Sequence, residues 1–160
     1  MIWFLSRAVI LATLVMLAHV ARVDFLTLKV RNRAILILLG LYALWAALTG
    51  FDTLPGDAGA AALLSVIALA MWLVGAMGAG DVKLYAVLGL FIGLSHLGLF
   101  VILLLLMSVA FLIALRNSGK STRGGQLNSR LREFNSTGKA PYAVLMCAAA
   151  IPAIGARAFL

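Results

Sequence analysis

Long runs of apolar residues, each about as long as a membrane-spanning helix, fill most of this 160-residue chain. A helix that crosses a bilayer needs about 20 mostly apolar residues. Measured against that length, the sequence predicts six spans, near 2–20, 34–50, 58–76, 82–95, 97–115 and 141–159. We divide 82–115 at Ser95 to Gly98, because the whole stretch is too long for one helix. A single long, tilted helix with a re-entrant segment is the alternative.

The composition also indicates a membrane protein. Apolar residues make up 64% of the chain and charged residues only 11%, whereas about 25% of residues are charged in soluble domains. The predicted fold is therefore all-α, a polytopic membrane helix bundle of about six transmembrane helices that forms a single domain over residues 1–160. No small-residue cleavage signature precedes Asp24, so we expect the first run to stay as a helix and not to be removed as a signal peptide.

Basic residues gather in the segments between alternate predicted spans. Four lie in 22–33, one is Lys83 and six lie in 116–139, which accounts for eleven of the 13. The positive-inside rule then places these segments in the cytoplasm and both termini outside. The net charge of +8 is thus explained by topology and contact with membrane lipid. It does not indicate a nucleic-acid partner, because the chain has no basic soluble module.

The segment 116–139 is rich in Ser, Gly, Asn and Arg, and we expect it to form a cytoplasmic basic loop. It also holds Glu133, one of the five acidic residues. Asp52 and Asp57 flank a Pro-Gly pair in a predicted outer turn, where aspartate commonly forms turns. Only Asp24 and Asp81 stand at predicted cytoplasmic ends of apolar spans.

An aspartate at membrane depth is costly, at about 2.5–3.5 kcal/mol on insertion scales, and usually serves a function. Each of the two also has a simpler interpretation. Asp81 could cap the start of a helix, and Asp24 could form an interfacial ion pair with Arg22 or Lys29. Two acids on the same side of the membrane, however, favour a pair that acts together.

The residues around Asp81 resemble a known motif. Gly78 and Gly80 precede Asp81, and Lys83 follows it, in the sequence GAGDVK. This resembles the GxGD motif, commonly GxGDxK, of the type IV prepilin peptidases, which are intramembrane aspartic proteases. Glycines on both sides of the turn let another backbone approach the aspartate closely.

Two further segments resemble the same family, and the likeness extends over about residues 20–155. The family has an earlier aspartate followed eight residues later by asparagine, as Asp24 and Asn32 are here. Val30-Arg31 stands where the family usually has Ile-Pro, so the local turn differs. Lys139-Ala-Pro-Tyr142 is similar to the basic residue and Pro-Tyr pair with which the family's last helix opens.

The resemblance implies an endopeptidase that removes the basic leader of a prepilin or pseudopilin at the cytoplasmic face of the bacterial inner membrane. Asp24 and Asp81 would be its catalytic pair, with one carboxylate activating water and the other, protonated, polarising the scissile carbonyl. Which of them is the base stays open, since such a pair titrates as a unit. Gly78, Gly80 and Lys83, together with Asn32, would lie where the substrate approaches.

The resemblance implies no cofactor and no metal site. Large members of the family carry a cytoplasmic insert with paired cysteines that bind zinc, associated with methyltransferase activity. This chain has one cysteine, Cys147, and only the short segment 21–33 at that location. We therefore expect the peptidase-only branch, similar to the enzymes of tight-adherence (Flp-type) pilus systems, without methyltransferase activity.

Two other classes of protein would also contain paired acids, or acids that have no function. In a small proton-coupled transporter or channel component, Asp24 and Asp81 would relay protons, but a relay needs acids spread through the membrane depth. A purely structural membrane subunit would tolerate Asp81→Ala. The sequence gives no indication of the oligomeric state.

Overall fold

The computed structural model describes residues 1–118 and 141–159, and within these ranges it contains helices and no strand. The predicted all-α class is confirmed. The five helices are α1 (Ile2–Thr27), α2 (Asn32–Leu48), α3 (Leu54–Leu73), α4 (Ala79–Ser118) and α6 (Tyr142–Phe159). Four of them are long and apolar enough to cross a membrane, while α2 is shorter. Six spans therefore remain a prediction, and most of the predicted basic loop 116–139 lies outside the described residues.

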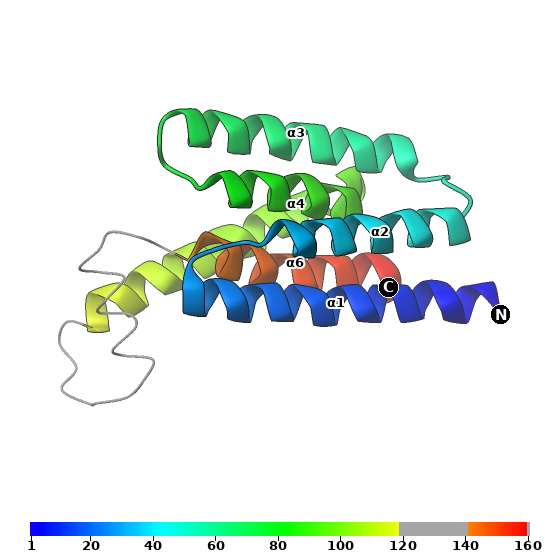
Figure 1. Ribbon diagram of the computed structural model, residues 1–160, viewed down its shortest axis with the longest axis horizontal. Helices are drawn as coiled ribbons and strands as arrows, with labels where there is room; N and C mark the ends of the chain where they lie inside the picture. Colours follow the sequence, from blue (N-terminus) through cyan, green and yellow to red (C-terminus); the bar gives the residue numbers. More distant parts are fainter. Residues whose placement is uncertain (119–140, 160) are drawn as a thin grey trace.

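The helices lie alongside one another in a single bundle (Figure 1). The first helix begins, and α6 ends, at the same end of this bundle, where α2 also passes into α3. The connections from α1 to α2 and from α3 to α4 lie at the opposite end, where α6 begins. The start of α4 is thereby brought to the end of α1 and the start of α6. Which membrane face each end meets stays a prediction.

The break expected between residues 95 and 98 occurs earlier, at Gly93. Its backbone angles, φ 65° and ψ 168°, interrupt the helical run of α4. The second half of α4 then turns back along the bundle (Figure 1). Ser95 and His96 stay helical, so their polarity was a misleading sign of the break. A positive φ favours glycine, which has no Cβ to clash, and this decides where the chain can reverse.

Close approach between α3 and α4 depends on a second glycine of α4. A Cβ added at Gly89 would lie 2.5 Å from Cα of Ala61, so the two backbones touch there. Small residues allow such contacts between membrane helices, where dispersion forces replace the hydrophobic effect as the main source of attraction. Gly89 therefore allows α4 to pack closely on α3, and Gly93 allows the chain to reverse.

Gly89→Ala is expected to lower the free energy of unfolding by about 1–3 kcal/mol, because the new methyl group must push two backbones apart. Gly98→Ala is the matched control on the same helix, since a Cβ there meets nothing within 4 Å. The control substitution should be neutral or slightly stabilising, because alanine has a higher helix propensity than glycine. Denaturant titration of the purified chain in detergent compares the two, and equal stability of both variants would contradict this account of the packing.

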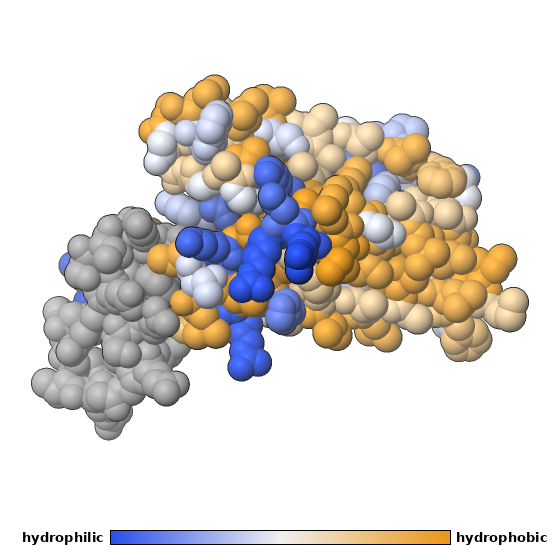
Figure 2. Space-filling view, in the orientation of Figure 1, coloured by the Kyte–Doolittle hydropathy of each residue, from blue (hydrophilic) through white to orange (hydrophobic). Residues whose placement is uncertain are grey.

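The outer surface is mostly apolar, as expected for a protein that lies in a membrane. Many large apolar side chains are exposed, among them Leu36, Val66 and Leu105 at 66%, 66% and 63%. Figure 2 shows hydrophobic side chains over much of this face and a group of hydrophilic ones toward its left, where α1 passes into α2 in Figure 1. The exposed basic residues of that segment are Arg22, Lys29, Arg31 and Arg33.

Candidate active site

Asp24 lies inside the last two turns of α1, because this helix continues to Thr27 and not only to residue 20 as expected. Leu28 ends it in a left-handed conformation, with its N–H bonded to the Asp24 carbonyl at 2.8 Å. The Asp24 side chain is 4% exposed. It faces the start of α6, where the backbone N–H groups of Ala143 and Val144 interact with its carboxylate.

One oxygen of that carboxylate has no partner. Asp24 Oδ2 is buried and makes no hydrogen bond within the part of the chain that the structure describes. Among these residues Asp24 also forms no ion pair with Arg22 or Lys29. An interfacial ion pair therefore does not account for an aspartate at this position. A buried carboxylate oxygen without a donor is costly. Such atoms are typical of sites that receive a ligand or a water molecule.

Asp81 is the third residue of α4 and folds back over the turn that precedes the helix. Its carboxylate interacts with the backbone N–H of Gly78, and a Cβ added at Gly78 would lie 3.2 Å from Asp81 Oδ2. An acid at the third helical position that reaches back to the cap is a known stabilising arrangement. The helix-cap interpretation is therefore right about the local geometry, and it leaves open what else the carboxylate does.

The two aspartates come together although they are far apart in the sequence. Their carboxylates are near enough for the charge of Asp81 to act on Asp24. Gly80 contributes to this closeness, since a Cβ there would lie 3.2 Å from Cβ of Val30. The α1–α2 connection thus packs directly on the turn before Asp81. Val30, the first residue of the Val30-Arg31 pair that departs from the motif, is part of that contact.

Lys83 and Asn32, the other two motif residues, are also brought together. Lys83 Nζ donates a hydrogen bond to Asn32 Oδ1 at 3.0 Å, on the exposed side of the site. The lysine therefore joins the start of α4 to the start of α2. Since residues two apart do not share a helix face, its side chain does not point at Asp81.

Two tyrosines flank the aspartates, and the sequence argument did not assign them a role. Tyr85 stands one turn after Asp81 on α4, and it lies near both Asp81 and Tyr142. Both tyrosines line an apolar cavity of about 340 Å³ between the end of α3, both halves of α4 and α6. Its other walls include Met71, Met77 and Met146. The four-residue spacing from Asp81 to Tyr85 was the available signal.

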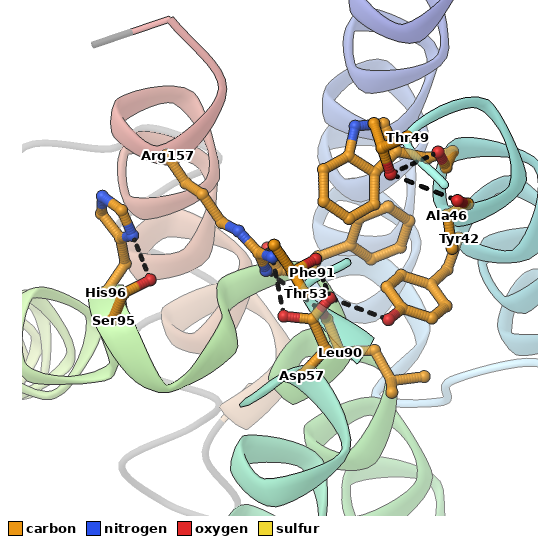
Figure 3. Close-up of polar contacts among 11 residues, drawn as sticks. Tyr42, Ala46, Thr49, Thr53, Asp57, Leu90, Phe91, Ser95, His96 and Arg157 are labelled. Atoms are coloured by element: carbon orange, nitrogen blue, oxygen red, sulfur yellow. Dashed lines mark hydrogen bonds and ion pairs between the residues drawn. The ribbon is translucent and has the colours of Figure 1, made fainter. Parts of the chain in front are cut away.

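A second polar cluster lies at the other end of the bundle, where the sequence led us to expect only a turn. Asp57 is not a turn former: it lies in the first turn of α3, and its Oδ1 pairs with Nη2 of Arg157 at 2.7 Å (Figure 3). Its Oδ2 accepts hydrogen bonds from Tyr42 and Thr53, each at 2.9 Å. The prediction for Asp57 was wrong because its partner, Arg157, lies far away in the sequence and only the fold brings the two together.

Arg157 also binds backbone carbonyls at the break in α4. Its Nη1 donates to the backbone carbonyl of Phe91 at 2.9 Å and to that of Leu90 at 3.3 Å. These carbonyls precede Gly93 and lose their usual helical donors at the break, and orphan carbonyls at a helix end need other partners. The guanidinium further lies 4.9 Å from the ring centre of Trp45. One side chain of α6 thus holds α2, α3 and α4 together.

Nothing in the described ranges forms a metal centre, since no three His, Cys, Asp or Glu side chains gather there. No curated protein and no solved structure is significantly similar to the chain. The sequence model of the type IV leader peptidase family matches residues 11–115, which include Asp24, Asn32 and the whole GAGDVK segment. The resemblance seen in the motifs is confirmed. Because the match covers well over half of the residues, the chain belongs to the type IV leader peptidase family.

Proposed function

We propose that this protein is an aspartic endopeptidase whose catalytic groups are Asp24 and Asp81. The observation that carries the proposal is that both aspartates lie at one end of the bundle, near enough for the charge of Asp81 to act on Asp24, whose buried Oδ2 lacks a partner among the described residues. Two carboxylates that share a site do not both ionise easily, so such a pair tends to hold one proton. That is the state from which an aspartic protease works.

The reaction needs one water molecule and no other reactant. The ionised carboxylate takes a proton from water, whose oxygen bonds to the scissile carbonyl carbon while the other carboxylate gives its proton to the carbonyl oxygen. In the tetrahedral species the C–N bond then breaks: the amine leaves with the proton that was taken from water, and one hydroxyl returns its proton to the other carboxylate, so a carboxylic acid is formed and the pair again holds one proton. The N–H groups of Ala143 and Val144 stabilise negative charge on Asp24 during these steps.

The substrate we propose is a prepilin or pseudopilin of the Flp type, cut between its basic leader and its apolar helix at the cytoplasmic face of the inner membrane. The apolar cavity beside Tyr85 and Tyr142 supports a substrate with an apolar segment next to the scissile bond. The single cysteine supports an enzyme without the zinc-binding insert and thus without methyltransferase activity. Lys83 and Asn32, with Gly78 and Gly80, are proposed to border the path of the substrate.

Co-expression with Flp-type prepilins tests the function. We expect the leader to be removed, which mass spectrometry of the new N-terminus of the pilin will show. The proton-coupled transporter is tested separately, by measuring proton flux into vesicles that contain the purified chain. Intact prepilins in the membrane together with proton flux would overturn the proposal, whereas cleavage without flux supports it.

A further inference from the structure

The groove between α1 and α2 combines an apolar floor with a basic rim. It has a volume of about 160 Å³ and lies outside the candidate active site. Its apolar walls come from the facing sides of the two helices, and its basic residues come from the connection and the first turn of α2. The lining consists of Met16, His19, Val20, Val23, Lys29, Val30, Arg31, Arg33, Ala34 and Ile37.

The two kinds of residue are separated along the helix axis. Met16 lies about three turns before the end of α1 and Ile37 about one and a half turns after the start of α2, whereas Lys29, Arg31 and Arg33 lie in or beside the connection. One end of the groove is therefore cationic and the other is apolar. The surface next to it is apolar as well, since Leu36 beside Ile37 is 66% exposed.

The cationic end is not neutralised by the protein within the described residues. Lys29, Arg31 and Arg33 are all exposed, and none of them forms an ion pair there. Asp24, the acid nearest in sequence, is buried and directed to the start of α6. Three positive charges within five residues thus line the groove.

We propose that this groove binds an anionic phospholipid, with the phosphate at Lys29, Arg31 and Arg33 and the beginning of an acyl chain against Val20 and Ile37. Guanidinium and ammonium groups bind phosphate oxygens by charge-assisted hydrogen bonds. The order of charge and apolar wall along the helices matches the order of headgroup and chain in a lipid. A basic leader peptide does not fit, because it would meet like charges, and the groove is too small for a folded partner.

The lipid would occupy a place next to the candidate active site without being part of it. Val30 lines the groove and also contacts Gly80, one residue before Asp81. A lipid held by the α1–α2 connection therefore steadies the segment that packs on the GAGDVK turn. This inference does not depend on the peptidase activity.

Native mass spectrometry of the full chain in detergent tests the site, with phosphatidylglycerol as the probe and phosphatidylcholine of the same chains as the neutral comparison. We expect preferential binding of phosphatidylglycerol. Each basic residue near an anionic lipid contributes roughly five-fold in affinity, so Arg31→Gln/Arg33→Gln should weaken that binding about 25-fold. The matched control, Arg22→Gln/Arg116→Gln, removes two charges outside the groove and should change it little.

A second pair of variants tests the apolar part of the groove. Ile37→Trp fills the groove and should reduce binding of phosphatidylglycerol, whereas Leu36→Trp, next to it and outside the lining, should not. Equal binding of the two lipids, or equal losses in groove and control variants, would overturn the proposal. Inorganic phosphate that competes as well as the lipid would also overturn it, because the site would then recognise phosphate alone.

Discussion

Asp24→Asn and Asp81→Asn are each expected to slow removal of the leader by at least about 100-fold, the low end of what a general acid or base contributes. Asparagine has nearly the same shape as aspartate but cannot take a proton from water or give one to a carbonyl. The rate is measured with the purified enzyme and a prepilin in detergent. Loss of one carboxylate disables the pair, so the double variant should be hardly slower than either single one, since residues that act as a unit are not additive.

The free energy of unfolding of the variants distinguishes a catalytic role of the two aspartates from a structural one. The charge of Asp81 disfavours an ionised Asp24, and Asp24 Oδ2 is buried without a donor among the described residues. Asp24→Asn should therefore leave the free energy of unfolding unchanged or raise it, as is common where a site is built for function. Asp52→Asn, an exposed acid of the α2–α3 connection, is the control and should change neither rate nor stability. A fully active Asp24→Asn or Asp81→Asn enzyme would refute the proposed pair.

Local signals in the sequence point to the end of the bundle that holds Asp24 and Asp81. Apolar runs of known length predicted helices in about the right places, although not their ends, and the GAGDVK segment with Asn32 resembled a family motif. The structure adds contacts that spacing cannot supply, such as the bond from Lys83 to Asn32 and the approach of the α6 N–H groups to Asp24. These join elements more than fifty residues apart, so no periodicity could show them.

The other end of the bundle was predicted less well, for two physical reasons. The reversal in α4 was assigned to the polar residues after it, yet backbone freedom at Gly93 decides its position. Asp57 was assigned to a turn because it follows Pro-Gly, although a charge in an apolar span normally has a partner. The terminal apolar run contains one basic residue, Arg157, and this single charge was the signal that would have pointed to a buried ion pair.

Arg157→Met is expected to lower the free energy of unfolding by about 3–5 kcal/mol, the cost of breaking a buried ion pair on one side. The Arg157 and Asp57 side chains are only 9% and 2% exposed. Without Arg157, Asp57 keeps a buried charge with only hydroxyl donors, and the carbonyls of Leu90 and Phe91 lose their donor at the break in α4. Unfolding is followed by circular dichroism during titration with sodium dodecyl sulfate.

The double variant Arg157→Met/Asp57→Leu distinguishes a lost ion pair from lost packing. In Arg157→Met the buried charge of Asp57 has no cation beside it, and Asp57→Leu removes that charge. The double variant should therefore be more stable than Arg157→Met alone. Arg22→Met, on the exposed side of α1, is the control for loss of a cation and should stay within about 0.5 kcal/mol of wild type. A double variant less stable than Arg157→Met would contradict the ion-pair explanation. Because this cluster and the aspartate pair lie at opposite ends of the bundle, Arg157→Met enzyme that remains folded should still cleave prepilin.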